Sequence, residues 1–274
     1  MLKRAVRKPA VAGQFYPSQP DRLRSMVEEF VDGSGVEPAP DKVAALVVPH
    51  AGYVYSGQTA GYAYARVRGK SPKRVIVAGC SHREYISTAS VWTSGAFQTP
   101  LGSFPIDEAF AQALAEETGS DSTNPHSLEH ALEVQLPFLA AVFGEVPIVP
   151  VLFGASSTEW HAGIGRALAK LTEDDDLLVA STDLSHYLCE EEANIIDKRT
   201  IEAVLAGDWQ QFSRGIAAGD YSMCGATAVA TAMTYAQARD ATSWQLLDYR
   251  TSAGASRDYD RVVGYAAISM ECEG

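Results

Sequence analysis

The stretch Val43-Ala-Ala-Leu-Val-Val-Pro-His-Ala-Gly-Tyr-Val-Tyr-Ser-Gly57 decides the fold that we expect for this chain of 274 residues. Its first six residues form an apolar run of the length typical of a buried strand. Pro49 has no amide hydrogen and ends the pairing of that strand, so that His50 follows directly. Open α/β sheets bind their ligands outside the carboxyl ends of the strands. The stretch therefore predicts a buried strand with a functional histidine at its end.

The same pattern occurs twice more along the chain. An apolar run from Arg74 leads into Gly79-Cys-Ser-His82, and a run from Leu177 leads into Ser181-Thr-Asp-Leu-Ser-His186. Each run ends in a histidine, and loops that follow separate strands can bring such side chains together. We therefore interpret His50, His82 and His186 as parts of one site rather than as isolated structural histidines.

Strand-like and helix-like segments alternate along the sequence. We expect strands at 43–48, 74–79, 89–93, 146–153, 177–182, 244–250 and 261–269, and a hairpin at 95–105. We expect helices at 23–31, from Ser56 to about Val67, from Asp107 to Gly119, from about Ser127 with a break at Pro137, at 158–171, 190–206 and 208–217, and from Cys224 onward. This order predicts an α/β fold, with a mixed, mostly parallel central sheet flanked by helices, in one domain over residues 1–274.

Composition excludes several classes of function. Hydrophobic residues make up 46% of the chain and charged residues 20%, so a large core is available. A net charge of −12 disfavours binding to nucleic acid or to anionic membranes. No apolar segment approaches the roughly 18 residues of a membrane span. The basic segment Met1–Lys8 lacks the apolar core of a signal peptide, so we expect a cytoplasmic protein.

The four cysteines are scattered, without a C-x-x-C pair, which disfavours a disulfide framework or a zinc knuckle. A cysteine with a function would then act as a lone thiolate. Cys224 begins a predicted helix, where the pKa of a thiol falls. It is a better thiolate candidate than Cys80, because the apolar strand around Cys80 would raise its pKa. The alternative for Cys224 is a small buried filler.

The histidines indicate a metal site. Neutral imidazoles suit iron, zinc or copper, and two histidines with one anionic ligand and open positions are typical of Fe(II) sites that use oxygen. The anionic ligand could be Asp183, Glu129 or a thiolate. Asp183 and His186 could be ligands, or an orienting carboxylate with a general acid/base. Glu129-His130 forms a second polar cluster, with the alternative that its acid only favours a helix N-terminus.

Six motifs, in order over nearly the whole chain, resemble those of the Memo family. They are Ala12-Gly-Gln-Phe-Tyr-Pro17, Pro49-His-Ala-Gly-Tyr-Val-Tyr-Ser-Gly57, Gly79-Cys-Ser-His82, Glu129-His-Ala-Leu-Glu-Val-Gln-Leu-Pro-Phe138, Ser181-Thr-Asp-Leu-Ser-His186 and Met223-Cys-Gly225. Bacterial and archaeal members are also called AmmeMemoRadiSam system protein B. The family is similar in fold to the class III (LigB-type) extradiol dioxygenases, which implies a metal pocket at one edge of the sheet.

The resemblance implies roles for individual residues. His50, His82 and Cys224 become the expected metal ligands. The expected catalytic residues are His186, Asp183, Glu129 and His130, and the expected substrate-binding aromatics are Phe15, Tyr53 and Tyr55. The sequence departs from many relatives at Ala131, where they have serine, and from the dioxygenases in having cysteine in place of a carboxylate ligand. Because a thiolate is itself oxidisable, dioxygenase chemistry does not follow from the fold alone.

Three functions remain open at this stage. The first is a metal-dependent oxidoreductase, with Fe(II) as the expected metal, copper second and zinc third, acting on a small aromatic or phenolic molecule. The second is a binding module that captures metal or a phosphotyrosine or other phenol-bearing peptide. The third, zinc-dependent hydrolysis, lacks any H-E-x-x-H-like motif. The resemblance also implies AMMECR-like and radical-SAM partner proteins.

Overall fold

The computed structural model of this chain describes residues 5–120 and 124–273. The first four residues of the basic N-terminal segment lie outside the described residues, as do residues 121–123 and 274. None of the helices in the described ranges is long and apolar enough to cross a membrane.

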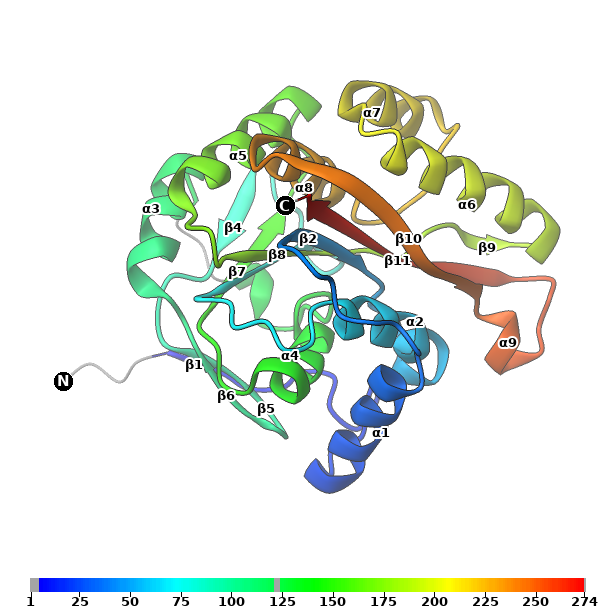
Figure 1. Ribbon diagram of the computed structural model, residues 1–274, viewed down its shortest axis with the longest axis horizontal. Coiled ribbons are helices and arrows are strands. Elements are labelled where there is room, and N and C mark those ends of the chain that lie inside the picture. The colour runs from blue at the N-terminus through cyan, green and yellow to red at the C-terminus, as the bar shows by residue number, and fades with distance from the viewer. Residues whose placement is uncertain (1–4, 121–123, 274) are drawn as a thin grey trace.

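A large mixed sheet forms the centre of the molecule (Figure 1). Its strands, in spatial order, are β10 (Ala241–Thr251), β11 (Val262–Cys272), β2 (Val43–Val48), β8 (Leu177–Ser181), β3 (Val75–Cys80), β7 (Ile148–Phe153) and β4 (Ala89–Val91), with β9 (His186–Leu188) paired to β11. The four strands β2, β8, β3 and β7 run parallel to one another, whereas β4, β9, β10 and β11 pair antiparallel. The prediction of a mixed α/β sheet flanked by helices is confirmed.

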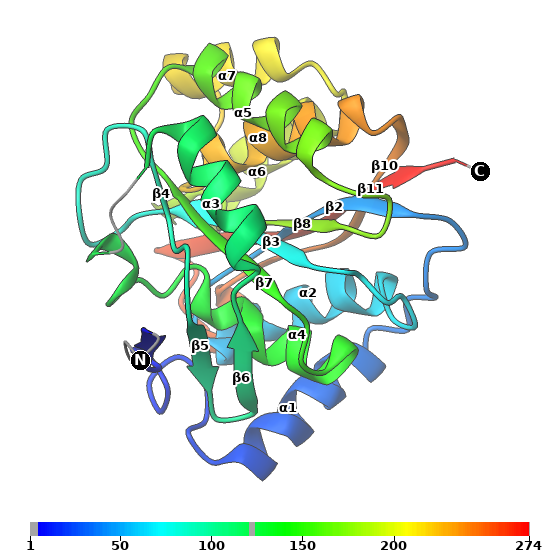
Figure 2. The ribbon, with the colours of Figure 1, turned by 90° about the vertical axis from the view of Figure 1, so that its left-hand side faces the viewer.

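The central strands are buried on both faces, which explains their unbroken apolar sequences. Every residue of β2, β7 and β8 is buried. Helices cover both faces of the sheet, with α1, α2 and α4 on one side and α3, α5 and α8 on the other (Figure 2). A small second sheet combines β1 (Val6–Arg7), β5 (Ala96–Thr99) and β6 (Gly102–Pro105).

The helices largely follow the predicted segments. They are α1 (Pro20–Asp32), α2 (Tyr53–Arg66), α3 (Glu108–Thr118), α4 (Leu136–Phe143), α5 (Thr158–Leu171), α6 (Glu190–Leu205), α7 (Trp209–Ala218), α8 (Ala226–Ala238) and the short α9 (Ala253–Ser256), with 3₁₀ turns η1 (Asn124–His126) and η2 (Glu133–Gln135). As predicted, Asp107 caps α3 and Gly119 ends it in a left-handed conformation.

The start of α2 differs from the prediction. We expected Ser56 to cap this helix, but the helix begins at Tyr53, and the Ser56 hydroxyl donates to the Ala51 carbonyl (3.0 Å). Gly61 explains why this helix lies so close to α1: a Cβ at Gly61 would lie 2.3 Å from the Phe30 carbonyl oxygen. The pairing of α1 with α2 therefore requires glycine at this position.

The predicted helix from Ser127 is wrong. Between η1 and η2 the chain is irregular, and the helix starts only at Leu136, with Pro137 in its first turn. Proline suits the first turn of a helix, where its missing N–H costs no hydrogen bond. The Glu133 carboxylate instead accepts hydrogen bonds from the amides of Ala10 and Val11. The Glu133 side chain thus ties this segment to the N-terminal arm.

Candidate metal centre

Three potential ligands meet where the central parallel strands end. His50 follows β2, His82 follows β3, and Cys224 precedes α8. One ligand atom from each, an imidazole nitrogen or the thiol sulfur, lies within 4.8 Å of the other two. Since β8 pairs with both β2 and β3, the loops after these strands leave the sheet side by side. The structure brings together all three residues that the sequence predicted as metal ligands.

Cys224 is fixed against the end of β8 by its backbone. Its amide donates to the Asp183 carbonyl (3.1 Å), and the amide of Gly225 donates to the Thr182 hydroxyl (2.8 Å). A Cβ at Gly225 would lie 2.6 Å from the Ser181 carbonyl oxygen, so only glycine allows this close approach. The helix begins at Ala226, two residues later than predicted, and Cys224 therefore stands just before the helix N-terminus.

The hydrogen bonds of Ser181 set the tautomer of His50. The Ser181 hydroxyl donates its single hydrogen to the Ala131 carbonyl (2.6 Å) and accepts from the Gln135 amide (2.8 Å). It can therefore only accept from His50 Nδ1, which lies 3.0 Å away. The proton on Nδ1 leaves Nε2 of the neutral ring free, and Nε2 lies 3.3 Å from the Cys224 sulfur. Such a partner on the other nitrogen is typical of metal-binding histidines.

Glu129 orients His82 in the same way. Its carboxylate lies 2.9 Å from His82 Nδ1 and also accepts from the amides of His82, His130 and Ala131. Burial would raise the pKa of Glu129, but hydrogen bonds from His130 and His82 and from these amides lower it well below its usual range. The ionised carboxylate therefore holds the proton on Nδ1 of His82 and leaves Nε2 available.

The three potential ligands and their acidic neighbours interact as a cluster of charges. Burial would lower the pKa of His50, yet the neighbouring Cys224 and Asp183 outweigh it and raise this pKa to about 9. Burial would also lower the pKa of His82, but Cys224 and Glu129 outweigh it and raise this pKa to about 10. Without a metal the anionic groups thus hold protons on both imidazoles. A metal cation bound in place of these protons would neutralise the negative charge of the same anionic groups.

A second group of ligand atoms joins His82 and Glu129 to His130. The Nδ1 atom of His130 lies 3.2 Å from the Glu129 carboxylate, at ion-pair distance. The rings of His50, His82 and His130 are mutual neighbours, with centroids 4.6 to 5.4 Å apart. Because Glu129 already accepts several hydrogen bonds, it is better suited to orient His82 than to bind an ion.

A pocket of about 390 Å³ opens beside this centre. Of the residues predicted for catalysis or substrate binding, five line it: Phe15, Tyr55, His130, Asp183 and His186. Tyr53 does not, because it is buried and its hydroxyl donates to the Val134 carbonyl (2.6 Å) in the core. The predicted substrate contact of Tyr53 therefore has no counterpart in this pocket.

Asp183 and His186 reach the pocket from the loop after β8. The Asp183 carboxylate accepts from the His50 amide (2.7 Å), and burial raises its pKa. Nδ1 of His186 lies 2.9 Å from the Leu184 carbonyl oxygen, which can only accept, so this nitrogen carries the proton. Nε2 of the neutral His186 ring is then a free base.

The sequence did not reveal the residues that hold the Glu129 segment in place through hydrogen bonds. Arg7 is buried and donates to the carbonyls of His126 and Glu129 and to the Glu133 carboxylate (2.7 Å). The Tyr16 hydroxyl donates to the same carboxylate (2.6 Å). Tyr187 and Arg261, at the mouth of the pocket, were also missed. The side-chain contacts of Arg7 and Tyr16 with Glu133, and of Tyr187 with Arg261, join residues more than 70 positions apart, and such distant contacts leave no spacing pattern in the sequence.

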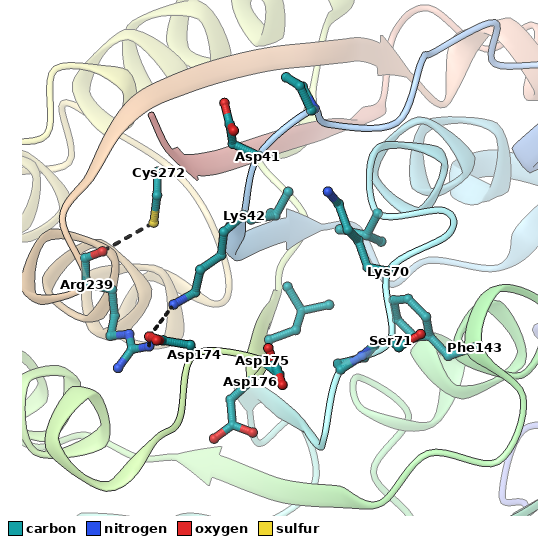
Figure 3. Close-up of a pocket in the computed structure, with 15 residues that line it drawn as sticks. Asp41, Lys42, Lys70, Ser71, Phe143, Asp174, Asp175, Asp176, Arg239 and Cys272 are labelled. Carbon is teal, nitrogen blue, oxygen red and sulfur yellow. Dashed lines mark hydrogen bonds and ion pairs between the residues drawn. The ribbon is translucent and has the colours of Figure 1, made fainter. Parts of the chain in front are cut away.

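A larger cavity, of about 570 Å³, lies at the opposite edge of the sheet (Figure 3). Lys42 and Arg239 converge there on Asp174, at 3.2 and 2.6 Å, and the Cys272 thiol donates to the Arg239 carbonyl. The two groups of potential metal ligands found among the described residues are both at the other edge.

Comparisons with known proteins agree with the motifs. The family described as Memo-like protein matches residues 7–269. A MEMO1 family protein of Methanopyrus kandleri is 38% identical over 276 residues, which cover 96% of this chain and 98% of the relative. A MEMO1 family protein of Thermoplasma volcanium is 37% identical over 270 residues, covering 96% and 97%.

A solved structure supports the fold alone. The crystal structure of an uncharacterized protein from Escherichia coli K12 matches with a TM-score of 0.53 at 12% identity. The match covers 84% of this chain and all of the other. At this identity the likeness extends to the arrangement of helices and strands and to nothing finer.

Proposed function

The chain belongs to the Memo-like protein family, and from this premise we propose that it is a metal-dependent oxidoreductase acting on a small phenolic molecule. The observation that carries the proposal is the convergence of one ligand atom each from His50, His82 and Cys224 within 4.8 Å. Each imidazole is oriented through Nδ1, by Ser181 or by Glu129, so that Nε2 can bind an ion.

The donor set suits a redox metal. Two imidazoles and a thiolate leave coordination positions open, as in Fe(II) proteins that use oxygen, and they also suit copper or zinc. Fe(II) is the first candidate in this proposal, copper the second and zinc the third. A bound iron or copper ion would supply the electron transfer that oxidation of a phenol by O₂ requires.

The protein's own residues would bind the phenol and move its proton. Phe15 and Tyr55 provide aromatic surface in the pocket, and pockets of a few hundred Å³ hold small molecules. The free Nε2 of His186 accepts the phenolic proton, because the Leu184 carbonyl keeps the other proton on Nδ1. Asp183, buried between His50 and the pocket, holds the His50 backbone in place.

Metal content is the first test. Protein purified without oxygen should contain close to one equivalent of iron or copper by mass spectrometry, and His50→Ala and His82→Ala should lack it. Oxygen uptake with catechols should then depend on His186, so His186→Ala should keep its metal and lose turnover. Uptake that is unchanged in His186→Ala would refute the assigned proton transfer. Metal-free protein that also refuses Fe(II) and Cu(I) would refute the metal centre.

A binding module is the second candidate, and the mouth of the pocket favours it. Tyr187 has a left-handed backbone (φ 64°), which is uncommon without glycine and often marks functional sites. Its ring lies 5.2 Å from the Arg261 guanidinium. The backbone amide of Arg261 donates to Asp258 (3.3 Å), which fixes the turn. Arg261 could bind the phosphate of a phosphotyrosine peptide whose ring enters the pocket.

Calorimetry separates the two candidates. A binding module should release heat with phosphotyrosine, and Arg261→Met should weaken that binding, while catechols show no oxygen uptake. Absence of heat with and without metal would remove this candidate.

A further inference from the structure

A buried carboxyl group lies behind the loop that carries His186. Asp197 belongs to α6, which packs against β9, β10 and β11 (Figure 1). Its side chain is completely buried, and it is not among the residues that line the pocket beside the metal centre. A carboxyl group is almost never buried so fully unless specific partners satisfy it. The contacts of Asp197 therefore indicate what it does.

The Asp197 carboxyl group bonds to the backbone of that loop. Its Oδ1 accepts from the Ser185 amide (2.9 Å), and its Oδ2 accepts from the Tyr249 hydroxyl on β10 (2.9 Å). A Cβ at Gly264 of β11 would lie only 1.8 Å from Oδ2, so any side chain there would displace the carboxyl group. Asp197 thus passes close over the backbone of β11 to contact the loop.

Every backbone polar group of the two residues before His186 has a partner. The Leu184 amide donates to the Gly264 carbonyl (2.8 Å), and the Gly264 amide donates to the Ser185 carbonyl (3.0 Å). The Leu184 carbonyl accepts from Nδ1 of His186 (2.9 Å), and the Ser185 amide donates to Asp197. Among these partners, Asp197 is the one side chain that comes from another element.

The bond from Ser185 matters for His186 because one peptide group joins the two contacts. The Leu184 carbonyl and the Ser185 amide are the two ends of a single planar peptide unit. Asp197 holds the amide end, and the carbonyl end holds the proton on Nδ1 of His186. The partner of one ring nitrogen decides whether the other is free to act as a base. Hydrogen bonds in such a chain also strengthen one another.

The residue after His186 shows why the loop has to be held. Tyr187 has a left-handed backbone (φ 64°), which is unfavourable without glycine and persists only where the surroundings enforce it. The pairing of Leu188 with Val262 fixes the chain after Tyr187, and the bond to Asp197 fixes it before. The loop is therefore fixed on both sides of the strained residue.

We propose that Asp197 is a positioning residue for His186. Through the peptide group between Leu184 and Ser185, it fixes the tautomer of His186 with the proton on Nδ1 and the place of the free Nε2. Asp197 contacts neither the pocket nor the proposed ligands and acts only through His186. The role of His186 as a base rests on the proposed function, whereas the tautomer and its dependence on Asp197 rest on the hydrogen bonds alone.

Nuclear magnetic resonance tests the proposal without turnover. Long-range ¹H–¹⁵N spectra of ¹⁵N-labelled protein, with and without Zn²⁺, distinguish the two neutral tautomers, and His186→Gln identifies the signals of His186. We expect the proton on Nδ1 in the wild type. Asp197→Ala and Asp197→Ser lack the acceptor and should show a mixture of tautomers. Asp197→Asn keeps an oxygen acceptor for the Ser185 amide and should restore the wild-type spectrum.

Tyr249→Phe is the matched control. It removes the other hydrogen bond of Asp197 but leaves the one from Ser185, so it should lower the urea midpoint and keep the tautomer of His186. Catechol oxidation gives a second comparison. Asp197→Ala should lower kcat about 100-fold, as a misplaced group can, with KM unchanged because Asp197 does not line the pocket. Asp197→Asn and Tyr249→Phe should stay close to wild type.

Each other outcome leads to a definite conclusion. If Asp197→Ala and Asp197→Ser fold and keep the proton on Nδ1, Asp197 is purely structural and the proposal is wrong. A proton on Nε2 of His186 in the wild type refutes it without any variant. If neither variant folds, the carboxyl group serves the whole fold, and a role specific to His186 is refuted. Absence of catechol oxidation in the wild type would refute the oxidoreductase, while the spectra still decide the role of Asp197.

Discussion

The two edges of the central sheet differ in a way that cavity size does not reveal. The edge where the parallel strands begin, here called the amino edge, has the larger cavity, about 570 Å³. The edge where they end, the carboxyl edge, has the cavity of about 390 Å³ beside the candidate metal centre. At the amino edge the ion pairs of Asp174 are in contact with water. Asp174, which bridges Lys42 and Arg239, has a side chain 91% exposed. At the carboxyl edge, His50 and Glu129 are only 2% and 1% exposed.

Burial explains why chemistry is expected at one edge only. Water screens the ion pairs around Asp174, so that they contribute little to stability. At the carboxyl edge the same kinds of groups interact in a low dielectric, and their pKa values shift strongly. Polar groups held this way are preorganised to bind an ion, whereas solvated charges are not. The comparison shows that a cluster of buried polar side chains indicates the site better than the volume of a cavity does.

The sharpest test of this contrast exchanges one cysteine at each edge for serine. Cys224→Ser should abolish metal binding, because a hydroxyl stays protonated where the thiol ionises. Cys272→Ser, at the amino edge, should bind metal as wild type does. Metal content and Zn²⁺ titration with a competing chelator measure both. Equal affinities in the two variants would remove the distinction between the edges.

Buried ion pairs at the two edges allow a comparison of stability with function. Glu133 pairs with Arg7 below the metal centre, and Asp176 pairs with Arg74 at the amino edge (2.9 Å). Removing one partner of a buried pair costs about 3–5 kcal/mol. Glu133→Ala and Asp176→Ala should therefore both lower the urea midpoint.

Only one of these two variants should also affect metal binding. Glu133 holds the segment that carries Glu129 and His130, so Glu133→Ala should weaken Zn²⁺ binding under folding conditions. Asp176→Ala should leave it unchanged. If only Asp176→Ala lost affinity for Zn²⁺, the metal site would have to be placed at the amino edge instead.

Metal affinity should rise steeply with pH. The pKa values of His50 and His82 are raised to about 9 and 10, so at neutral pH a metal displaces one proton from each. The pKa of Cys224 is lowered, so this thiol adds less to the proton release. Affinity should therefore increase by about 100-fold per pH unit below pH 9. A slope near zero in chelator-corrected Zn²⁺ titrations would contradict proton displacement.

The same shifts predict how the stability of metal-free protein depends on pH. The folded-state pKa values of His50 and His82 exceed the unfolded value of about 6.5. Their contribution is complete below that value and is lost as pH rises through 9 and 10. Metal-loaded protein should keep more of its stability over this window.

The smallest effect is expected for the carboxylate that orients His82. Glu129→Gln keeps the shape but removes the charge, and loss of such a partner typically lowers metal affinity about 10- to 100-fold. Asp174→Asn is the matched change at the amino edge and should alter neither affinity nor stability measurably. Calorimetry with Zn²⁺ measures both variants. Unchanged affinity in Glu129→Gln would show that its hydrogen bond to His82 is dispensable.

Much of the fold was predictable because buried strands and helix ends have recognisable patterns of adjacent residues. The six apolar residues before Pro49 became β2 with the predicted bounds, and Asp107 and Gly119 bound α3 as expected. The segment after Ser127 failed for the opposite reason. Its acidic side chains bond to the N-terminal arm, and a distant partner leaves no periodic signal.

The sequence by itself determined the family, the buried strands and the identity of the three expected ligands. Each depends on local order: an apolar run, a chain-breaking proline, a motif of adjacent residues. Only the tertiary structure decided that Ser181 and Glu129 set the tautomers and that Tyr53 faces the core. These facts depend on which strands become neighbours, and strand order follows from packing the whole chain.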